Sequence, residues 1–153
     1  MSEVIIERTF KADPDTVFAY ITKTENLIKW WGPEGITIPE HKLDFTKLGY
    51  WTSTMEHRDG KCHKVSGEVL SIDKPNTVEF TWRWHDENDI RGHESRVRFE
   101  VRKNQNGGTQ FIMTHAGLES DEFAQKHNQG WNSTFNKLDL LDEEMTTRSS
   151  ENA

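Results

Sequence analysis

The sequence is rich in side chains that can stack on an apolar ligand, because six of its 153 residues are tryptophans. Residues 78–84 alternate apolar and polar side chains, so Trp82 and Trp84 share one face of a predicted strand. Trp51 and Trp131 lie in other segments with the same inward bias. So many indoles in a small chain predict either a cavity lined by aromatic rings or a solidly packed aromatic core.

Seven histidines and one cysteine raise the question of a metal site. A two-residue hairpin turn at Asp59-Gly60 would make His57 and Cys62 neighbours across two strands, which supplies two possible ligands. Two ligands do not make a site, and the sequence has no His-Glu-x-x-His spacing. We therefore predict no metal. A single cysteine also excludes an intrachain disulfide.

Candidate acids and bases are few. His115 ends the inward face of a predicted strand, and His127 lies one helical turn before Trp131. Either imidazole could exchange a proton near neutral pH, but the pattern favours structural histidines. An enzyme of this fold would need a perturbed titratable residue in the cavity, and Arg8 is the third candidate beside the two histidines. No glycine-rich loop is followed by Lys-Ser or Lys-Thr. We predict no catalytic residue and no cofactor.

Length and charge narrow the classes of partner. A chain of 153 residues fits one domain, and its formal net charge of -7 argues against binding to a nucleic-acid backbone. No apolar run approaches the roughly 20 residues that span a bilayer, and the first residues do not resemble a leader peptide. We expect a cytoplasmic protein that does not insert into membranes, either a monomer or a weak homodimer.

The pattern along the chain alternates between strands and helices. Residues 4–10 predict a strand, Asp13 fits the N-cap of a short helix, and Thr24 fits the cap of a second one that stops at Gly32. Residues 36–115 predict antiparallel strands separated by turns. Their single apolar face requires a cover.

Residues 120–145 are predicted to form the helix that covers the apolar face of the sheet. Ser120 fits an N-cap, and apolar side chains at spacings of three and four predict one helix, with an apolar face, that crosses the sheet. Residues 1–146 then form a single domain, and residues 147–153 are predicted to be a disordered tail.

This order of elements resembles the α+β helix-grip fold of the START/Bet v 1-like superfamily. Short segments of the sequence are similar to those of one branch of this superfamily, the activator of Hsp90 ATPase homologue 1-like proteins. The similarity is carried by segments in a fixed order, namely residues 10–14 (FKADP), 30–35 (WWGPEG), 67–69 (GEV), 80–82 (FTW), 108–109 (GT), 114–118 (THAGL) and 130–131 (GW).

The resemblance implies a curved sheet of about seven strands around the long C-terminal helix, with a pocket between them. We expect the pocket to bind a small hydrophobic molecule, aromatic or lipid-like. An enzyme of the same fold, of hydrolase or cyclase type, is one alternative, and a module that interacts with a chaperone is another. The ligand-binding residues predicted are Trp30, Trp51, Ser53, Met55, Trp82, Trp84, Phe99, Met113, His115, His127, Trp131 and Phe135.

Overall fold

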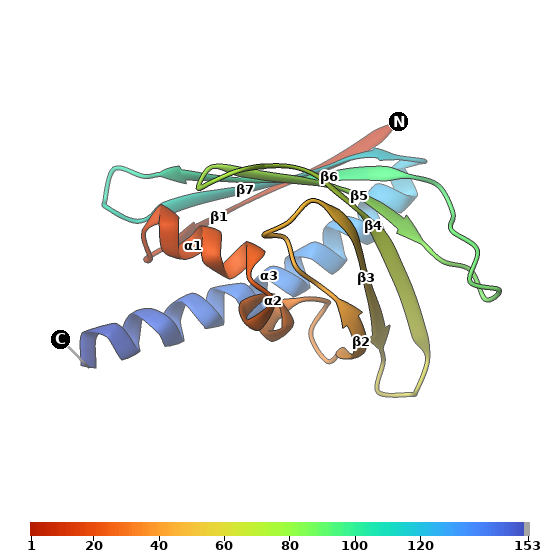
Figure 1. Ribbon diagram of the computed structural model, residues 1–153, viewed down its shortest axis with the longest axis horizontal. Helices are drawn as coiled ribbons and strands as arrows, with labels where there is room; N and C mark the ends of the chain where they lie inside the picture. Colours follow the sequence, from red (N-terminus) through yellow and green to blue (C-terminus); the bar gives the residue numbers. More distant parts are fainter. Residues whose placement is uncertain (152–153) are drawn as a thin grey trace.

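A computed structural model describes the backbone of residues 1–151 and the side chains of residues 1–147 (Figure 1). The elements in chain order are β1 (Ser2–Phe10), α1 (Pro14–Thr22), α2 (Thr24–Trp30), β2 (Thr37–Lys42), β3 (Gly49–Glu56), β4 (Cys62–Asp73), β5 (Thr77–Trp84), β6 (Ser95–Lys103), β7 (Thr109–Leu118) and α3 (Asp121–Glu151).

The strands form one antiparallel sheet in the order β1-β7-β6-β5-β4-β3-β2. Consecutive strands are neighbours, except that β1 returns to pair with β7. In Figure 1 the sheet arches over α3, and α1 and α2 lie on the same concave side. The predicted α+β helix-grip fold with seven strands and two short helices after the first strand is confirmed.

Two helix boundaries differ from the sequence-based expectation. Thr24 is the first residue of α2 and not its cap, because its hydroxyl donates to the carbonyl oxygen of Leu43. The α3 helix was expected to end at Met145 and continues to Glu151, and Thr146 Oγ1 donates to the Asp142 carbonyl 2.7 Å away within it. Residues 147–151 of the predicted tail are therefore helical, and residues 152–153 lie outside the described part of the chain.

The hairpin between β3 and β4 differs from the predicted two-residue turn at Asp59-Gly60. Cys62 pairs with Glu56, and the His57 amide donates to the Lys61 carbonyl at 2.8 Å, so the loop has three residues and not two. Gly60 takes the left-handed conformation, with φ of 89°, that such loops require. The extra residue moves Cys62 away from His57, and the His57 ring instead meets His63, with ring centroids 5.0 Å apart.

Gly67 allows β4 to sit tightly between its neighbours. It pairs with Trp51 on β3, whose Nε1 donates to the Thr81 carbonyl of β5 at 3.2 Å. A Cβ atom at Gly67 would lie 1.9 Å from that carbonyl oxygen and 2.7 Å from the indole nitrogen. Only glycine fits here, and its absent side chain is what lets the Trp51 indole reach across β4 to the backbone of β5.

The C-terminal half of α3 is anchored to β1 and to the turn that follows it. The buried carboxylate of Asp142 accepts the amides of Lys11 and Ala12 at 2.7 and 3.2 Å, and the hydroxyl of Tyr20 at 3.3 Å. Burial and this carboxylate raise the pKa of Tyr20, which keeps the phenol protonated as the donor. The N-terminal half of α3 is left to form a wall of a cavity.

Candidate functional site

A cavity of about 610 Å³ opens between the sheet and the N-terminal half of α3. Its walls come from the turn after α2, the β3–β4 hairpin, the end of β5 and α3. The lining side chains are Trp31, Gly32, Pro33, Ile36, Met55, His57, His63, Trp82, Trp84, Phe123, Lys126, His127, Gly130, Trp131 and Thr134.

Five of the twelve residues predicted from the sequence line this cavity, namely Met55, Trp82, Trp84, His127 and Trp131. The other seven lie in the packed interior and do not line the cavity, namely Trp30, Trp51, Ser53, Phe99, Met113, His115 and Phe135. The aromatic residues are thus divided between the two roles. One group packs in the interior between the sheet and α3, and the other lines the cavity.

Trp30 and Trp31 show why adjacent residues differ in role. Trp30 Nε1 donates to the Tyr20 carbonyl at 2.9 Å, which turns its ring into the core against Phe99, at 6.2 Å between ring centroids. Trp31 follows the end of α2 in an extended conformation, with Nε1 donating to Ser53 Oγ on β3 at 2.9 Å. Its ring stands edge-on to Trp131 and lines the cavity.

Sequence reasoning missed ten lining residues. Gly32, Pro33 and Ile36 follow Trp31 in a turn without periodicity, and His57 and His63 depend on the hairpin register. Phe123, Lys126, Gly130 and Thr134 lie on α3. Their spacing continues the row formed by His127 and Trp131, so a wider helical face was the available signal.

The six indole N–H groups are almost fully paired. Trp30 and Trp51 donate to carbonyl oxygens, Trp31 to Ser53, Trp84 to His127 and Trp131 to His115. Trp82 differs, because its Nε1 is buried and finds no hydrogen-bond partner among the described residues. A buried donor left unpaired costs about 1–3 kcal/mol. Trp82 lines the cavity, but its Nε1 is covered, so an acceptor there would recover that free energy only after the surrounding side chains shift to uncover the N–H.

His115 is a neutral structural histidine. Its Nδ1 accepts the Trp131 indole N–H at 3.0 Å, so the ring proton resides on Nε2, which donates to Ser95 Oγ at 2.7 Å. That hydroxyl donates onward to the Trp82 carbonyl at 3.3 Å. Burial, helped by the neighbouring His127, lowers the pKa of His115 to about 3. With both nitrogens bonded, His115 has no proton to exchange with a substrate.

His127 repeats this arrangement at the cavity wall. Its Nε2 accepts the Trp84 indole N–H at 3.0 Å, and its Nδ1 donates to the Phe123 carbonyl at 2.8 Å. Burial lowers the pKa of His127 as well. The two histidines orient two indoles. They support the structural role that the sequence favoured over acid–base catalysis.

Arg8, the third candidate for chemistry, is also engaged. Its guanidinium contacts Asp139 Oδ2 at 2.5 Å and Asn132 Oδ1 at 3.0 Å, both on α3. It fastens β1 to the helix and does not line the cavity.

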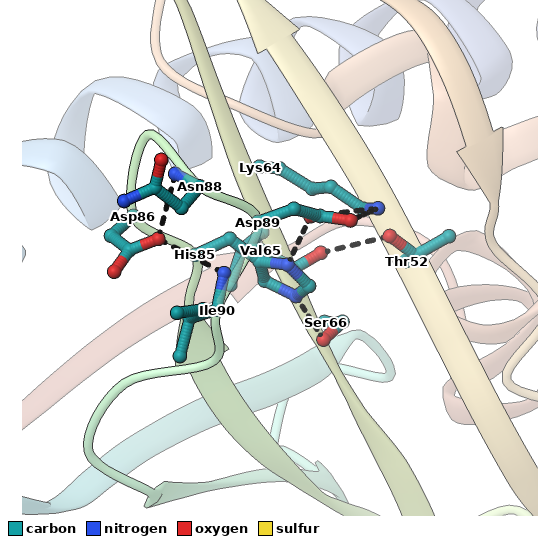
Figure 2. Close-up of polar contacts among 9 residues, drawn as sticks. All are labelled: Thr52, Lys64, Val65, Ser66, His85, Asp86, Asn88, Asp89 and Ile90. Atoms are coloured by element: carbon teal, nitrogen blue, oxygen red, sulfur yellow. Dashed lines mark hydrogen bonds and ion pairs between the residues drawn. The ribbon is translucent and has the colours of Figure 1, made fainter.

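A second polar cluster lies on the convex face of the sheet (Figure 2). Ser66 Oγ is 2.6 Å from His85 Nε2, and His85 Nδ1 is 2.7 Å from Asp89 Oδ1. Asp89, with φ of 62°, also pairs with Lys64 at 3.2 Å. The hydrogen bonds from His85 and Lys64 lower the pKa of its carboxyl group.

The order Ser-His-Asp is that of a hydrolase triad, but Ser66 is 0% exposed. A nucleophile must reach a substrate carbonyl, and this hydroxyl is buried and linked through the His85 ring to Asp89 in the loop between β5 and β6 (Figure 2). Within that loop, Asp86 Oδ1 accepts the amides of Asn88 and Ile90, both at 2.9 Å. The cluster thus fastens the loop to the sheet.

Metal-binding and membrane-spanning features were also sought. Among the residues that the structure describes, no three His, Cys, Asp or Glu side chains come together in a way that could hold a metal ion. Within the same part of the chain, no helix combines the length and apolar character needed to cross a bilayer.

A curved antiparallel sheet that encloses a long C-terminal helix, with a cavity between them, defines a helix-grip protein. Comparison with known proteins gives the particular family. The chain belongs to the family described as activator of Hsp90 ATPase homolog 1-like protein, whose model matches residues 11–142.

Solved structures agree with this assignment. The chain is similar to the AHSA1 protein from Silicibacter pomeroyi, at 40% identity over 96% of this chain and 99% of that one, with a TM-score of 0.89. A Chromobacterium violaceum protein, at 18% identity over 94% and 99%, has a TM-score of 0.81 and shares the fold. So does a protein from Arthrobacter aurescens, at 22% identity over 93% and 86%, with a TM-score of 0.78. No curated protein sequence matches the chain.

Proposed function

We propose that the protein binds a small, largely apolar molecule that carries a hydrogen-bond acceptor, in the cavity between the sheet and α3. One observation carries the proposal. The cavity is walled by indole rings, and one of these residues, Trp82, carries the one indole N–H that is unpaired among the described residues.

The dimensions and chemistry of the cavity support this proposal. A volume of about 610 Å³ falls within the range of roughly 300–1,000 Å³ typical of small-molecule sites. Trp31, Trp82, Trp84 and Trp131 offer flat rings on which an apolar ligand can stack. An apolar molecule with an acceptor would satisfy the Trp82 N–H, whereas a pure hydrocarbon would leave it unpaired.

The state of the titratable side chains supports binding over catalysis. His115 and His127 are neutral, and each uses both ring nitrogens in hydrogen bonds. Arg8 is bonded to α3, and Ser66 is buried and in contact with His85. These four candidates for acid, base or nucleophile are therefore committed to the fold.

Two probes of the same shape test the acceptor. 2-Acetylnaphthalene carries a carbonyl group, and 2-ethylnaphthalene replaces that group with a methylene. We expect calorimetric titration to show tighter binding of the acetyl compound by about five- to tenfold, the worth of roughly one hydrogen bond. Trp82→Phe removes the N–H and keeps a ring, so the preference should disappear in that variant.

A matched pair of cavity variants tests the location. A Cβ atom at Gly130 would have only Pro33 Cγ near it, at 4.0 Å, so the site has room for a side chain. Gly130→Leu should fill the cavity and abolish binding, whereas Gly130→Ala should retain it. Unchanged affinity in the leucine variant, with its folding verified by circular dichroism, would place any binding elsewhere and refute the proposal.

A further inference from the structure

The polar side chains that line the cavity have an unusual charge balance. The chain carries 26 acidic and 19 basic residues, yet none of the lining residues is Asp or Glu. The titratable groups of the lining are Lys126 and three histidines. An acidic protein thus has a cavity whose lining carries no carboxylate.

The lining residues also differ in exposure between the interior and the mouth of the cavity. Trp82 and Trp131 are buried, at 4% and 5% exposure, whereas His57, His63 and Lys126 are exposed. His57 and His63 stand together on the β3–β4 hairpin, and Lys126 belongs to the opposite wall on α3. The cavity therefore has an apolar interior and a mouth with hydrogen-bond donors on two sides.

We propose that the ligand is an apolar carboxylate, with its body among the indoles and its acid group at the mouth between His57, His63 and Lys126. This inference rests on the proposed function and adds a second polar group to its ligand, because the acid group at the mouth is distinct from an acceptor that meets Trp82 in the interior. An ammonium group and imidazole N–H groups are donors suited to a carboxylate, because hydrogen bonds to a charged acceptor are the stronger kind. A neutral ligand would gain less from the same donors.

The carboxylates near the mouth either bind these donors weakly or are engaged by other side chains. Glu122 lies 3.7 Å from Lys126, one turn earlier on α3, and both side chains are largely exposed, so the pair holds the ammonium only weakly. Glu34 and Asp59 line a neighbouring hollow together with Arg58. There Glu34 accepts hydrogen bonds from Ser133 and Asn136.

Two probes that differ in charge test the inference. Naphthalene-2-acetate and naphthalene-2-acetamide share the aromatic body and a carbonyl acceptor, and only the first is an anion at pH 7.5. We expect the acetate to bind more tightly by about threefold to fivefold for each donor engaged, the range of an exposed ion pair. Calorimetric titration at low ionic strength measures both affinities, since salt screens such contacts.

Variants locate the acid group. Lys126→Gln should weaken the acetate by about threefold to fivefold and leave the acetamide unchanged. A triple variant with His57→Gln and His63→Gln added should remove the preference. Arg58→Gln is the matched control, because it deletes a cation just outside the cavity lining. An effect of Arg58→Gln equal to that of Lys126→Gln would indicate general electrostatics and overturn the assigned position.

The remaining outcomes separate the two proposals. Equal binding of acetate and acetamide, both blocked by Gly130→Leu, would overturn the carboxylate inference and leave the proposed function standing. Binding of neither probe, together with no binding of 2-acetylnaphthalene, would overturn the proposed function and the inference with it. Preference for the acetate that disappears in the triple variant would support both.

Discussion

The buried neutral state of His115 predicts how the stability of the protein responds to acid. In the unfolded chain an imidazole binds a proton below its ordinary pKa of about 6.5, whereas in the folded protein burial lowers that pKa to about 3. Between these two values the unfolded state binds more protons. The free energy of unfolding must therefore fall as the pH falls from about 6.5 toward about 3, and this contribution is fully present above 6.5.

The magnitude follows from the width of the interval. At pH 5.0 the medium lies about 1.5 pH units below the unfolded value, and each unit corresponds to about 1.36 kcal/mol. His115 alone should thus lower the free energy of unfolding by about 2 kcal/mol between pH 7.5 and pH 5.0. The result at pH 5.0 depends little on the folded pKa, because that value lies well below 5.0.

Urea unfolding followed by circular dichroism measures this quantity in the wild type and in His115→Gln. Glutamine can accept from Trp131 and donate to Ser95 without titrating. The loss of stability between pH 7.5 and pH 5.0 should be smaller in the variant by about 2 kcal/mol. The exposed His41→Gln is the control for removal of one imidazole, and we expect it to retain the wild-type response. An identical response in His115→Gln and the wild type would show that His115 takes up a proton in the folded state.

Three further substitutions test the packing described above. Trp131→Phe should destabilise the protein more than Trp82→Phe by about 1–3 kcal/mol in urea unfolding, because only the first substitution leaves a buried imidazole acceptor unpaired. Equal losses of stability in the two variants would contradict the unpaired state of the Trp82 N–H. Gly67→Ala should cost more than about 3 kcal/mol, since its Cβ would meet backbone 1.9 Å away; a variant that melts like the wild type would refute that close approach. Asp89→Ala should speed amide hydrogen exchange in the loop between β5 and β6, as its contacts to His85 and Lys64 are lost, and unchanged exchange would show that the cluster does not fasten the loop.

The overall fold was predictable because its signals are periodic. Alternation in residues 78–84 placed Trp82 and Trp84 on one face of β5, and spacings of three and four placed His127 and Trp131 on one face of α3. Both patterns report which face of an element is buried. They carry no information on how deep in the interior each buried side chain lies.

The cavity was predictable only in part, because the depth at which a buried side chain lies depends on contacts between segments that are distant in the sequence. Trp51 matches the pattern of Trp82, yet its N–H reaches the backbone of β5 because Gly67 leaves room for its ring. Trp31 lies outside regular structure, and its direction follows from a bond to Ser53. Hydrogen bonds of this kind join residues far apart in the chain, so no local window of sequence shows them.

The division of α3 into an anchored half and a cavity-forming half has a consequence for how such proteins diverge. Asp142 and Asp139 fasten the C-terminal half, whereas Lys126 and Gly130 face the cavity two or more turns away. Substitutions well separated in space act on stability almost independently. In evolution, the residues that determine ligand specificity can therefore change while the contacts that hold the helix are kept. One scaffold can then bind different small molecules in different proteins.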